Sequence, residues 1–379
     1  MSTFSVDRAR ALAGPAWLRA RREEAAERFG ALSVPSAAEE IWRYSRIGEL
    51  DLDRFTPGAT GWHSTAPDAV AIDEARAALD GPSTDAFTVA NEAFAAAPLL
   101  VSVAAGHTVA DPIVVDHRID EDGVAAFPRL VVDAGRDSEC TIVERFTSAD
   151  VTALVVPVTV IRAQNGARVR YLAVNELGPK VWQIAAQRAD GDRDSTTLLA
   201  TVALGGDYAR VRTEARLVGQ GADGRQIALY FGEGHQMHDF RTTQEHVAPR
   251  TTSDLLFKGA VQDHAHSVYT GLIKIGRDAK GSNAFQTNRN LKLSEGAWAE
   301  SVPNLDIETN DVRCSHASTV GPVDPEQRFY LESRGVPPQV AERLIVLGFF
   351  DDVLARLPDP SLGAELHDAV AGKLDRQSS

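Results

Sequence analysis

The residues best suited to chemistry are Cys314, one of only two cysteines, and His316, two positions later on a segment that reads as extended. In a strand, successive side chains alternate between faces, so residues i and i+2 point the same way. A thiolate and an imidazole would then project side by side, a pair suited to zinc, copper or iron–sulfur chemistry. Two donors do not complete a tetrahedral site. A structural cysteine beside a hydrogen-bonded histidine is therefore the alternative interpretation.

A second group of possible donors is a set of histidines with H-x-x-H and H-x-H spacings. Its members are His235, His238, His246, His264 and His266. Such spacings can hold zinc or iron, with Asp239, Asp263 or Glu245 as additional ligands. Histidines that are hydrogen-bonded inside or along the fold are the interpretation we favour for this group.

Motifs for other chemistries are missing or misplaced. Residues 219–224 fit the formula G-x-G-x-x-G, but the residues after them read as a strand, whereas a dinucleotide site needs a helix there. We therefore interpret this segment as a turn. The sequence has neither a phosphate-binding loop ending in Gly-Lys-Ser/Thr nor a G-x-S-x-G elbow, so ATP hydrolysis must belong to another chain.

The composition is that of an ordinary globular protein, with 44% hydrophobic and 24% charged residues. A net charge of −14 argues against a general nucleic-acid binder. No apolar run approaches the ~20 residues of a membrane helix, and the first residues lack the apolar core of a signal peptide. Two cysteines imply no disulfide framework. We expect a cytoplasmic protein with neither a membrane nor a nucleic-acid partner.

The patterning divides the chain into a mainly helical region (residues 1–97), a β region (98–321) and a second helical region (322–379). In the first region, helical spacing runs from about residue 6 to 55, a further helix is expected through residues 39–42, and a short one near 73–79. This region could be a partner-binding arm. We favour a cap packed on the main body.

The β region consists of short apolar or alternating runs separated by Gly, Asn and Asp. The runs are residues 99–103, 130–132, 152–161, 168–174, 197–204, 211–217, 226–231, 255–261, 268–275 and 290–293. Such spacing fits a barrel, a sandwich or a β-solenoid.

A short internal repeat bears on the choice among these folds. Residues 167–170, Ala-Arg-Val-Arg, recur at 209–212, an offset that suits two solenoid turns of about twenty residues each. In a solenoid we expect Arg168, Arg170, Arg210 and Arg212 to point outward into solvent. Its terminal coils would expose backbone edges that must be capped or paired with another chain.

Three helices are expected in the last region, at residues 326–334, 339–347 and 362–374. Asp324 could cap the first helix and Gly335 end it. Val340, Leu344 and Leu347 share one stripe of the second, and Phe349 and Phe350 follow Gly348. These apolar residues could form a docking surface or close the end of the solenoid.

The stretch around Cys314 resembles the SufB/SufD family of iron–sulfur cluster assembly proteins, and specifically its SufD members. The resembling segments are Gln286-Thr-Asn, Asn290-Leu-Lys-Leu-Ser, Pro303-Asn-Leu-Asp-Ile-Glu, Asp311-Val-Arg-Cys-Ser-His and Phe329-Tyr-Leu-Glu-Ser-Arg-Gly. Upstream, the resemblance extends to Glu39-Glu-Ile-Trp-Arg-Tyr, His246-Val-Ala-Pro-Arg-Thr-Thr-Ser and Lys258-Gly-Ala-Val. It therefore covers most of the chain.

The resemblance implies a right-handed parallel β-helix core with N-terminal and C-terminal α-helical regions. It also implies a non-catalytic scaffold that pairs with a SufB-like subunit and carries a SufC-like ATPase on the C-terminal helices. In SufD-like proteins the histidine of the C-S-H motif, here His316, is linked to cluster building at the SufB interface. Cys314 is either a second ligand or a structural thiol. Ala317 stands where the family usually has glycine, which removes no donor.

The sequence leaves other interpretations of the function open. A SufB-like role needs a cysteine that accepts sulfur, and nothing around Cys140 marks it as one. A β-helix carbohydrate-active enzyme would need paired carboxylates such as Asp239 and Asp263 on one face. A plain interaction module would need no metal. The resemblance leaves open a homodimer, a reduced flavin, and whether iron or a transient cluster is held by this chain alone or shared with a partner.

Overall fold

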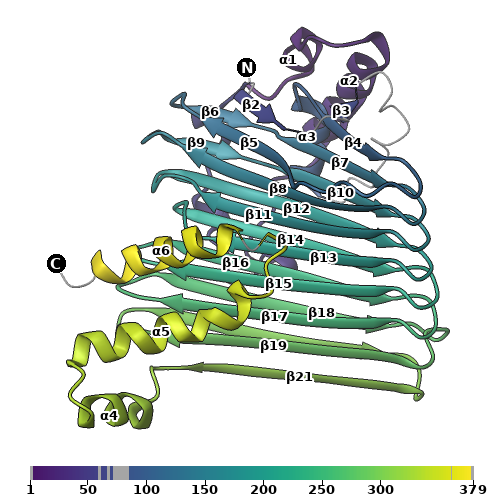
Figure 1. Ribbon diagram of the computed structural model, residues 1–379. Helices are drawn as coiled ribbons and strands as arrows, with labels where there is room; N and C mark the ends of the chain where they lie inside the picture. The colour runs from purple at the N-terminus through teal and green to yellow at the C-terminus, as the bar shows by residue number, and fades with distance from the viewer. Residues whose placement is uncertain (1–2, 59–60, 66–68, 71–84, 360, 377–379) are drawn as a thin grey trace.

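The computed structural model describes residues 3–58, 61–65, 69–70, 85–359 and 361–376. The chain forms a parallel β-solenoid with helices at its N-terminal and C-terminal ends (Figure 1). The predicted fold class, a mainly β protein with a parallel β-helix core and helical ends, is confirmed. All the strand runs expected from the sequence lie within or overlap observed strands.

The solenoid has two walls, each a sheet. The 12-stranded sheet consists of β1 Thr56–Gly58, β3 Ala69–Val70, β4 Leu99–Val103, β6 Val124–Ala126, β7 Arg129–Ala134, β9 Ala153–Val155, β10 Val158–Ala163, β12 Val181–Gly191, β14 Tyr208–Leu217, β16 Met237–His246, β18 His266–Ile275 and β20 Trp298–Ile307. The nine-stranded sheet consists of β2 Gly61–Ser64, β5 Ile113–Ile119, β8 Glu139–Ser148, β11 Arg168–Glu176, β13 Thr196–Ala203, β15 Asp223–Gly232, β17 Thr252–Val261, β19 Ser282–Lys292 and β21 Val312–Gly321. From β10 to β21 successive strands alternate between the two walls, and most of the pairings are parallel.

One coil is longer than the sequence repeat suggested. Arg168 lies opposite Thr196 and Thr196 opposite Asp223, so a coil takes about 28 residues rather than about twenty. The first Ala-Arg-Val-Arg segment leads into β11 and the second lies in β14, and these strands belong to different walls. The prediction of two turns between them was wrong. Side chains alternate between inward and outward in the strands of both walls, so a similar segment can recur in the opposite wall. A four-residue match cannot distinguish half a coil from a whole one.

The N-terminal region covers the outer face of the 12-stranded sheet. Its helices are α1 Val6–Ala11, α2 Ala16–Ala31 and α3 Ala86–Phe94, and single 3-10 turns occupy η1 Glu40–Trp42, η2 Ile47–Glu49 and η3 Leu52–Arg54. Phe94 and Trp42 are buried in one apolar cluster with Phe127, Trp182 and Tyr208 of the solenoid. This is the cap arrangement, as favoured from the sequence. The helix expected through residues 39–42 is only the turn η1, and the one expected near 73–79 lies outside the described residues.

The same cap corrects the expectation that all four outward arginines are wet. Arg168 is exposed, but Arg210 is 2% exposed. The guanidinium of Arg210 donates to Asp239 and to the backbone carbonyl of Ile41, and it lies 3.9 Å from the ring centroid of Trp42. Arg210 points outward as predicted, but the N-terminal segment covers that part of the wall.

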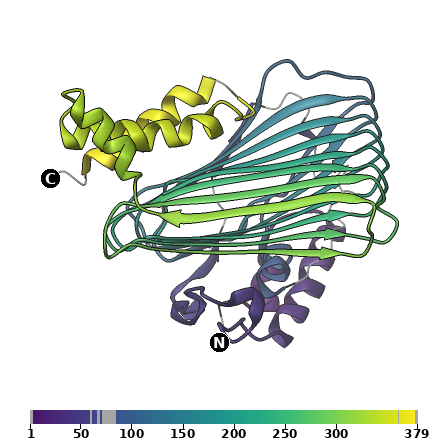
Figure 2. The same cartoon turned by 90° about the horizontal axis from the view of Figure 1, so that it is seen from below.

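The C-terminal region lies on the other wall. Helices α5 Pro338–Leu354 and α6 Ser361–Arg376 pack on the nine-stranded sheet, and α4 Pro325–Ser333 packs on α5. Gly348 does not end the second helix, as the sequence had suggested, because Phe350 and Val353 beyond it are buried against the sheet and extend the apolar stripe. Figure 2 shows the two helical regions on opposite sides of the solenoid. No helix in the described part of the chain is long and apolar enough to cross a membrane.

Candidate functional site

The last coil of the solenoid, formed by β20 and β21, is an open end. Each strand is the terminal member of its sheet: β20 pairs with β18 and β21 with β19, and no other described strand adds to their free edges. Figure 1 shows β21 at the edge of the solenoid, and Figure 2 views the molecule from this end. Free strand edges present unpaired backbone donors and acceptors, which are templates for another chain.

The register of β21 shows which of its side chains face the solenoid interior. Cys314 lies opposite Ala284 and His316 opposite Gln286, and both of these β19 residues are buried, whereas Phe285 between them is exposed. Since side chains of in-register parallel strands share the same face, Cys314 and His316 both point inward. The prediction that they project side by side is therefore met. The face that they share is the inner face of the last coil, where the solenoid opens to its surroundings, and we call this opening between β20 and β21 the mouth.

Cys314 is the more enclosed of the pair. Its side chain packs against a small apolar cluster that includes Ile273, Ile275 and Ala284. Partial burial raises the pKa of its thiol above the ordinary value, because the thiolate loses hydration. A thiolate at Cys314 therefore needs a neighbouring cation, metal or hydrogen-bond donor to form near neutral pH.

His316 lies at the surface of the mouth. It is exposed, as are the neighbouring apolar side chains Leu305, Ile307 and Val320. In the register of β20, Leu305 and Ile307 lie opposite the buried Ile273 and Ile275, so their side chains also face the interior side of the coil. The imidazole thus sits in an apolar rim that a second polypeptide could cover.

The mouth offers two donors rather than a complete metal site. Among the described residues, no group of three or more His, Cys, Asp or Glu side chains is placed to hold a metal ion. Cys314 is a soft donor and His316 a borderline one, and both suit iron or a nascent cluster. A four-coordinate ion held here would take its other ligands from outside this chain.

One side chain that the sequence did not mark as a site residue borders the mouth. Gln286 lies opposite His316 in the register and is 1% exposed. Neither Oε1 nor Nε2 of Gln286 has a hydrogen-bond partner among the described residues. The only sequence signal for it is its position at the start of the Gln286-Thr-Asn motif.

The structure separates the second histidine group into buried and exposed members. The two ring nitrogens of His246 lie 2.7 Å from Thr251 Oγ1 and 2.9 Å from Ser253 Oγ, and Nε2 of His238 lies 3.3 Å from the carbonyl of Gly205. Burial lowers the pKa of His246 to about 4 and that of His238 to about 3. Both are hydrogen-bonded within the fold, as favoured from the sequence.

The other histidines line a solenoid corner. His235 and His264 stack with ring centroids 5.4 Å apart, and His266 meets the edge of Trp298 at 5.5 Å. Of the carboxylates considered as extra ligands, Asp263 accepts the backbone N–H of Gly234 at 2.8 Å. The other two, Asp239 and Glu245, pair with arginines. These carboxylates are therefore already engaged in the fold.

The positions of Asp239 and Asp263 also bear on the alternative that the chain is a carbohydrate-active enzyme. Asp239 is fully buried between Arg210 and Arg241, and Asp263 lies on the turn before β18. A glycosidase needs two carboxyl groups that flank a bond in a solvent-accessible cleft. Asp239 does not meet that requirement.

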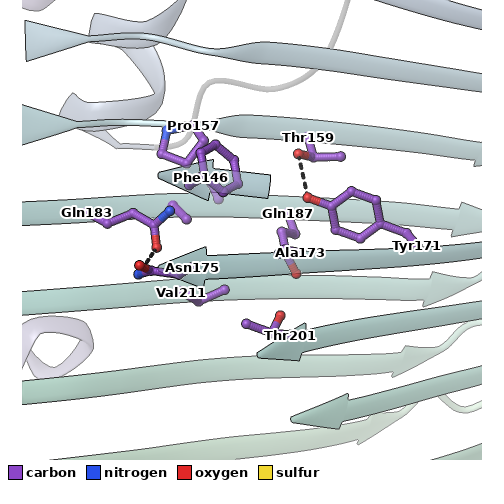
Figure 3. Close-up of a pocket in the computed structure, with 12 residues that line it drawn as sticks. Phe146, Pro157, Thr159, Tyr171, Ala173, Asn175, Gln183, Gln187, Thr201 and Val211 are labelled. Carbon is purple, nitrogen blue, oxygen red and sulfur yellow. Dashed lines mark hydrogen bonds between the residues drawn. The ribbon is translucent and has the colours of Figure 1, made fainter. Parts of the chain in front are cut away.

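The interior of the solenoid is packed and partly polar. Figure 3 shows a cavity whose lining includes Thr159 and Tyr171, with hydroxyl oxygens 3.2 Å apart, and Asn175, which donates to Gln183 at 2.8 Å. Its volume is about 10 Å³, room for about one water molecule. It cannot take a substrate of the size of a sugar.

Two further sequence features have structural roles. Cys140 is fully buried in the core, and desolvation raises its pKa to about 11, so its thiol stays protonated near neutral pH. Residues 219–222 connect β14 to β15 without a helix, and residues 223 and 224 already begin β15, which confirms that this glycine-rich segment is a turn.

A second exposed apolar surface lies on the C-terminal helices. It consists of Phe329 and Tyr330 on α4 and Val340 and Leu344 on α5, and we call these four residues the C-terminal patch. Phe329 is 72% exposed, whereas Phe350 on the opposite side of α5 is buried against the sheet. The helices therefore use one apolar side for the solenoid and leave another open.

Comparison with known proteins agrees with this architecture. The family model for the SufBD core domain of the SUF system for FeS cluster assembly matches residues 117–349. An iron–sulfur cluster assembly SufBD family protein of Mycobacterium tuberculosis is 32% identical over 368 residues, covering 91% of this chain and 90% of the relative.

Two SufD proteins also match. Iron–sulfur cluster assembly protein SufD of Bacillus subtilis is 31% identical over 67% of this chain and 59% of its own length. SufD of Escherichia coli is 27% identical over 85% of this chain and 77% of its own length. The matched core contains the end of β5, all strands from β6 to β21, and both Cys314 and His316. The chain therefore belongs to the SufBD family of SUF-system iron–sulfur cluster assembly proteins, with SufD proteins among its homologues.

Proposed function

We propose that this chain is a non-catalytic scaffold subunit that pairs with a SufB-like subunit through its open end and contributes His316 to cluster building there. The observation that carries the proposal is the position of His316. It is an exposed imidazole on the terminal strand β21, beside the free edges of the last coil. The cluster or iron is cargo in this proposal, held transiently and shared between the two subunits.

An incomplete donor set is suited to a transient role. A cluster held by four cysteines of one chain is retained by all of them, whereas a cluster shared between two chains can leave when the subunits separate or shift. Cys314 supports the proposal as a second donor, since it lies on the same strand face as His316. Its raised pKa means that it would bind as a thiolate only once iron or a partner cation is near.

The partner at the open end must supply both backbone and apolar contacts. The free edges of β20 and β21 favour strand addition or edge-to-edge pairing, as in other β-augmentation interfaces. The apolar rim formed by Leu305, Ile307 and Val320 favours burial against a similar surface. A SufB-like subunit with its own β-helix end would offer both, and a second copy of this chain would do so in a homodimer.

The C-terminal patch supports the second part of the proposal, the docking of a SufC-like ATPase. Exposed aromatic side chains such as Phe329 and Tyr330 are typical anchors of protein interfaces. The patch lies on α4 and on exposed positions of α5, outside the two strands that form the open end, so the two surfaces consist of different residues.

Within the family, a SufD-like role is favoured over a SufB-like one. A sulfur-accepting subunit needs a reactive thiol, and Cys140 is fully buried with a raised pKa. Cys314 lies at the mouth on the same strand face as His316, and partial burial raises the pKa of its thiol, so it too lacks the thiolate that a sulfur acceptor needs. The two cysteines are free thiols, which fits our placement of the chain in the reducing cytoplasm.

A co-purification experiment tests the proposal. A tagged copy of this chain, expressed with its SufB-like and ATPase partners, should retain both subunits through size-exclusion chromatography. A variant with Leu305→Arg and Ile307→Arg should lose the SufB-like subunit and keep the ATPase, because only the open end is altered. Loss of both subunits, or of neither, would contradict the assignment of the two surfaces.

A further inference from the structure

The inward polar side chains of β19 differ sharply in how many hydrogen-bond partners they have. Asn288 donates to Tyr230 at 3.0 Å and accepts from Asn290 at 2.8 Å, and Asn290 accepts from the hydroxyl of Tyr230 at 2.7 Å. Gln286 is on the same face of β19 and equally buried, yet its amide is bonded to nothing in the described residues. A buried amide without partners is costly, so its retention calls for a partner.

The surroundings of Gln286 keep space for its side chain and leave few competing groups. A Cβ atom at Gly271, on the facing wall, would lie 2.5 Å from Nε2 of Gln286, so the glycine leaves room for the amide in its present position. In the next coil, Pro303 lies opposite Gly271 and has no backbone N–H. Tyr269, the nearest hydroxyl to the same position, is already bonded to Thr242 at 3.1 Å.

The register pairs His316 with Gln286 on the neighbouring strand, with both side chains on the inner face. Neighbouring strands are separated by about 4.8 Å, so the amide and the imidazole are within reach of one another after rotation about the Gln286 side-chain torsions. Because neither Oε1 nor Nε2 has a partner to lose, that rotation breaks no hydrogen bond with the described residues.

A histidine that binds a metal uses the lone pair of one ring nitrogen, and its other nitrogen carries a proton. That N–H is almost always held by an acceptor, which fixes the tautomer and the orientation of the ring. We propose that Gln286 is this positioning residue: its Oε1 accepts the ring N–H of His316, so that the other ring nitrogen presents its lone pair to the open end. The inference rests on the proposed function of His316 and deepens it.

The tautomer of His316 can be read directly by NMR. The full chain is labelled with ¹⁵N-histidine, His316 is assigned with His316→Ala, and ring ¹⁵N shifts are recorded at about pH 8, where an ordinary imidazole is neutral. We expect a single tautomer in the parent chain. Gln286→Met, an apolar replacement of similar length, should move both ring resonances toward those of a mixed population. Gln286→Glu should restore the single tautomer, since a carboxylate also accepts the N–H.

A matched control is Gln226→Met. Gln226 is equally buried but lies on β15, two coils from β19, where it donates to Gln244 at 3.0 Å. It should leave the His316 shifts unchanged. Unchanged shifts in Gln286→Met would overturn the inference. Should Gln286→Met fail to fold, Gln286→Leu takes its place with the same expected shift.

Cluster yield in the co-expressed three-subunit complex separates this inference from the proposed function. Gln286→Met should lower the yield by roughly tenfold, as for other positioning residues of metal-binding histidines, and Gln286→Glu should recover it. A lower yield with parent-like ring shifts would assign Gln286 a packing role and overturn the inference. If His316→Ala lowers the cluster yield but Gln286→Met does not, the proposed function is supported and the inference on Gln286 is overturned. An unaffected His316→Ala complex would refute the proposed function, while the ring shifts still decide the hydrogen bond.

Discussion

Ser318 Oγ donates to Ser301 Oγ at 2.7 Å across the mouth of the solenoid, from β21 to β20. The two walls of the last coil are therefore joined on their inner side. Because side chains alternate along a strand, this contact also fixes the inward orientation of His316, two residues before Ser318. The two strands of the open end are thus held together, and the direction in which the His316 side chain points is defined.

The apolar rim of the open end should control pairing with the SufB-like subunit. Leu305→Arg places a charge where the proposal buries an apolar side chain, so binding should weaken at least tenfold, about 1.4 kcal/mol. Stability of the isolated chain should change by no more than about 0.5 kcal/mol, because Leu305 is already partly exposed. Isothermal titration with the partner measures the first effect and urea unfolding the second.

Val247→Arg is the matched control for that experiment. Val247 is about as exposed as Leu305 but lies after β16, away from the last coil. It should leave partner binding unchanged. Equal weakening by both variants would mean that added positive charge, rather than the open end, determines the result.

The C-terminal patch should control ATPase binding without affecting the fold. Phe329→Ser removes the most exposed aromatic side chain of the patch and should weaken ATPase binding at least tenfold, with the melting temperature almost unchanged. Phe350→Ala, on the buried side of α5, should instead lower stability by about 3–5 kcal/mol. Leu32→Ser, at an exposed apolar position of the N-terminal region, serves as the binding control. ATPase affinity that survives Phe329→Ser would place the docking site elsewhere.

The buried ion pair between Arg210 and Asp239 should anchor the N-terminal cap. Asp239→Asn leaves the Arg210 guanidinium buried without its anion and should cost about 3–5 kcal/mol of unfolding free energy. The exposed pair of Arg225 and Asp223 provides the comparison, and Asp223→Asn should cost no more than about 1 kcal/mol. Chemical denaturation of both variants measures the difference. Similar small losses in both would show that the cap does not depend on the pair.

Buried histidines should make the protein sensitive to mild acid. The pKa of His246 is lowered to about 4 in the folded chain against about 6.5 when unfolded, so between these values only the unfolded state gains the proton. Stability from this residue is therefore present above pH 6.5 and is lost as the pH falls toward 4. Between pH 7 and pH 5 the loss should be about 2 kcal/mol.

The variant His246→Gln tests that sign and size. Its unfolding free energy should be lower than that of the parent chain at pH 7, because the bonds to Thr251 and Ser253 are disturbed, but it should decline less on acidification by about 2 kcal/mol. Parallel pH profiles of the two proteins, measured by urea unfolding, would contradict the assignment.

Much of the fold could be predicted because apolar runs mark the solenoid walls. Residues 99–103 form β4 with the same bounds as the predicted run, and the runs from 255 to 275 lie in β17 and β18. Some of the strands without a predicted run have polar side chains in the solenoid interior. In β8, for example, Glu144 faces inward and binds His117 and Tyr171, so the apolar periodicity is broken.

The site could be predicted only in part. The spacing of Cys314 and His316 predicts a shared face, and the register of β21 bears this out. The spacing of residues does not show which coil is the last one. The exposure of His316 and the burial of Gln286 beside it therefore do not follow from the sequence. Likewise, Arg210 has an outward pattern, but its burial depends on Trp42, which is distant in sequence.

In the proposed function, His316 takes part in cluster building at the boundary with a second subunit. The most direct test is the iron and sulfide content of the complex purified after co-expression of His316→Ala with the SufB-like and ATPase subunits. His367→Ala, which removes a solvent-accessible histidine from α6, is the control. We expect His316→Ala to assemble normally but to carry at least tenfold less cluster than either the parent or the control complex. A fully assembled His316→Ala complex with the parent's cluster content would show that His316 has no part in cluster building.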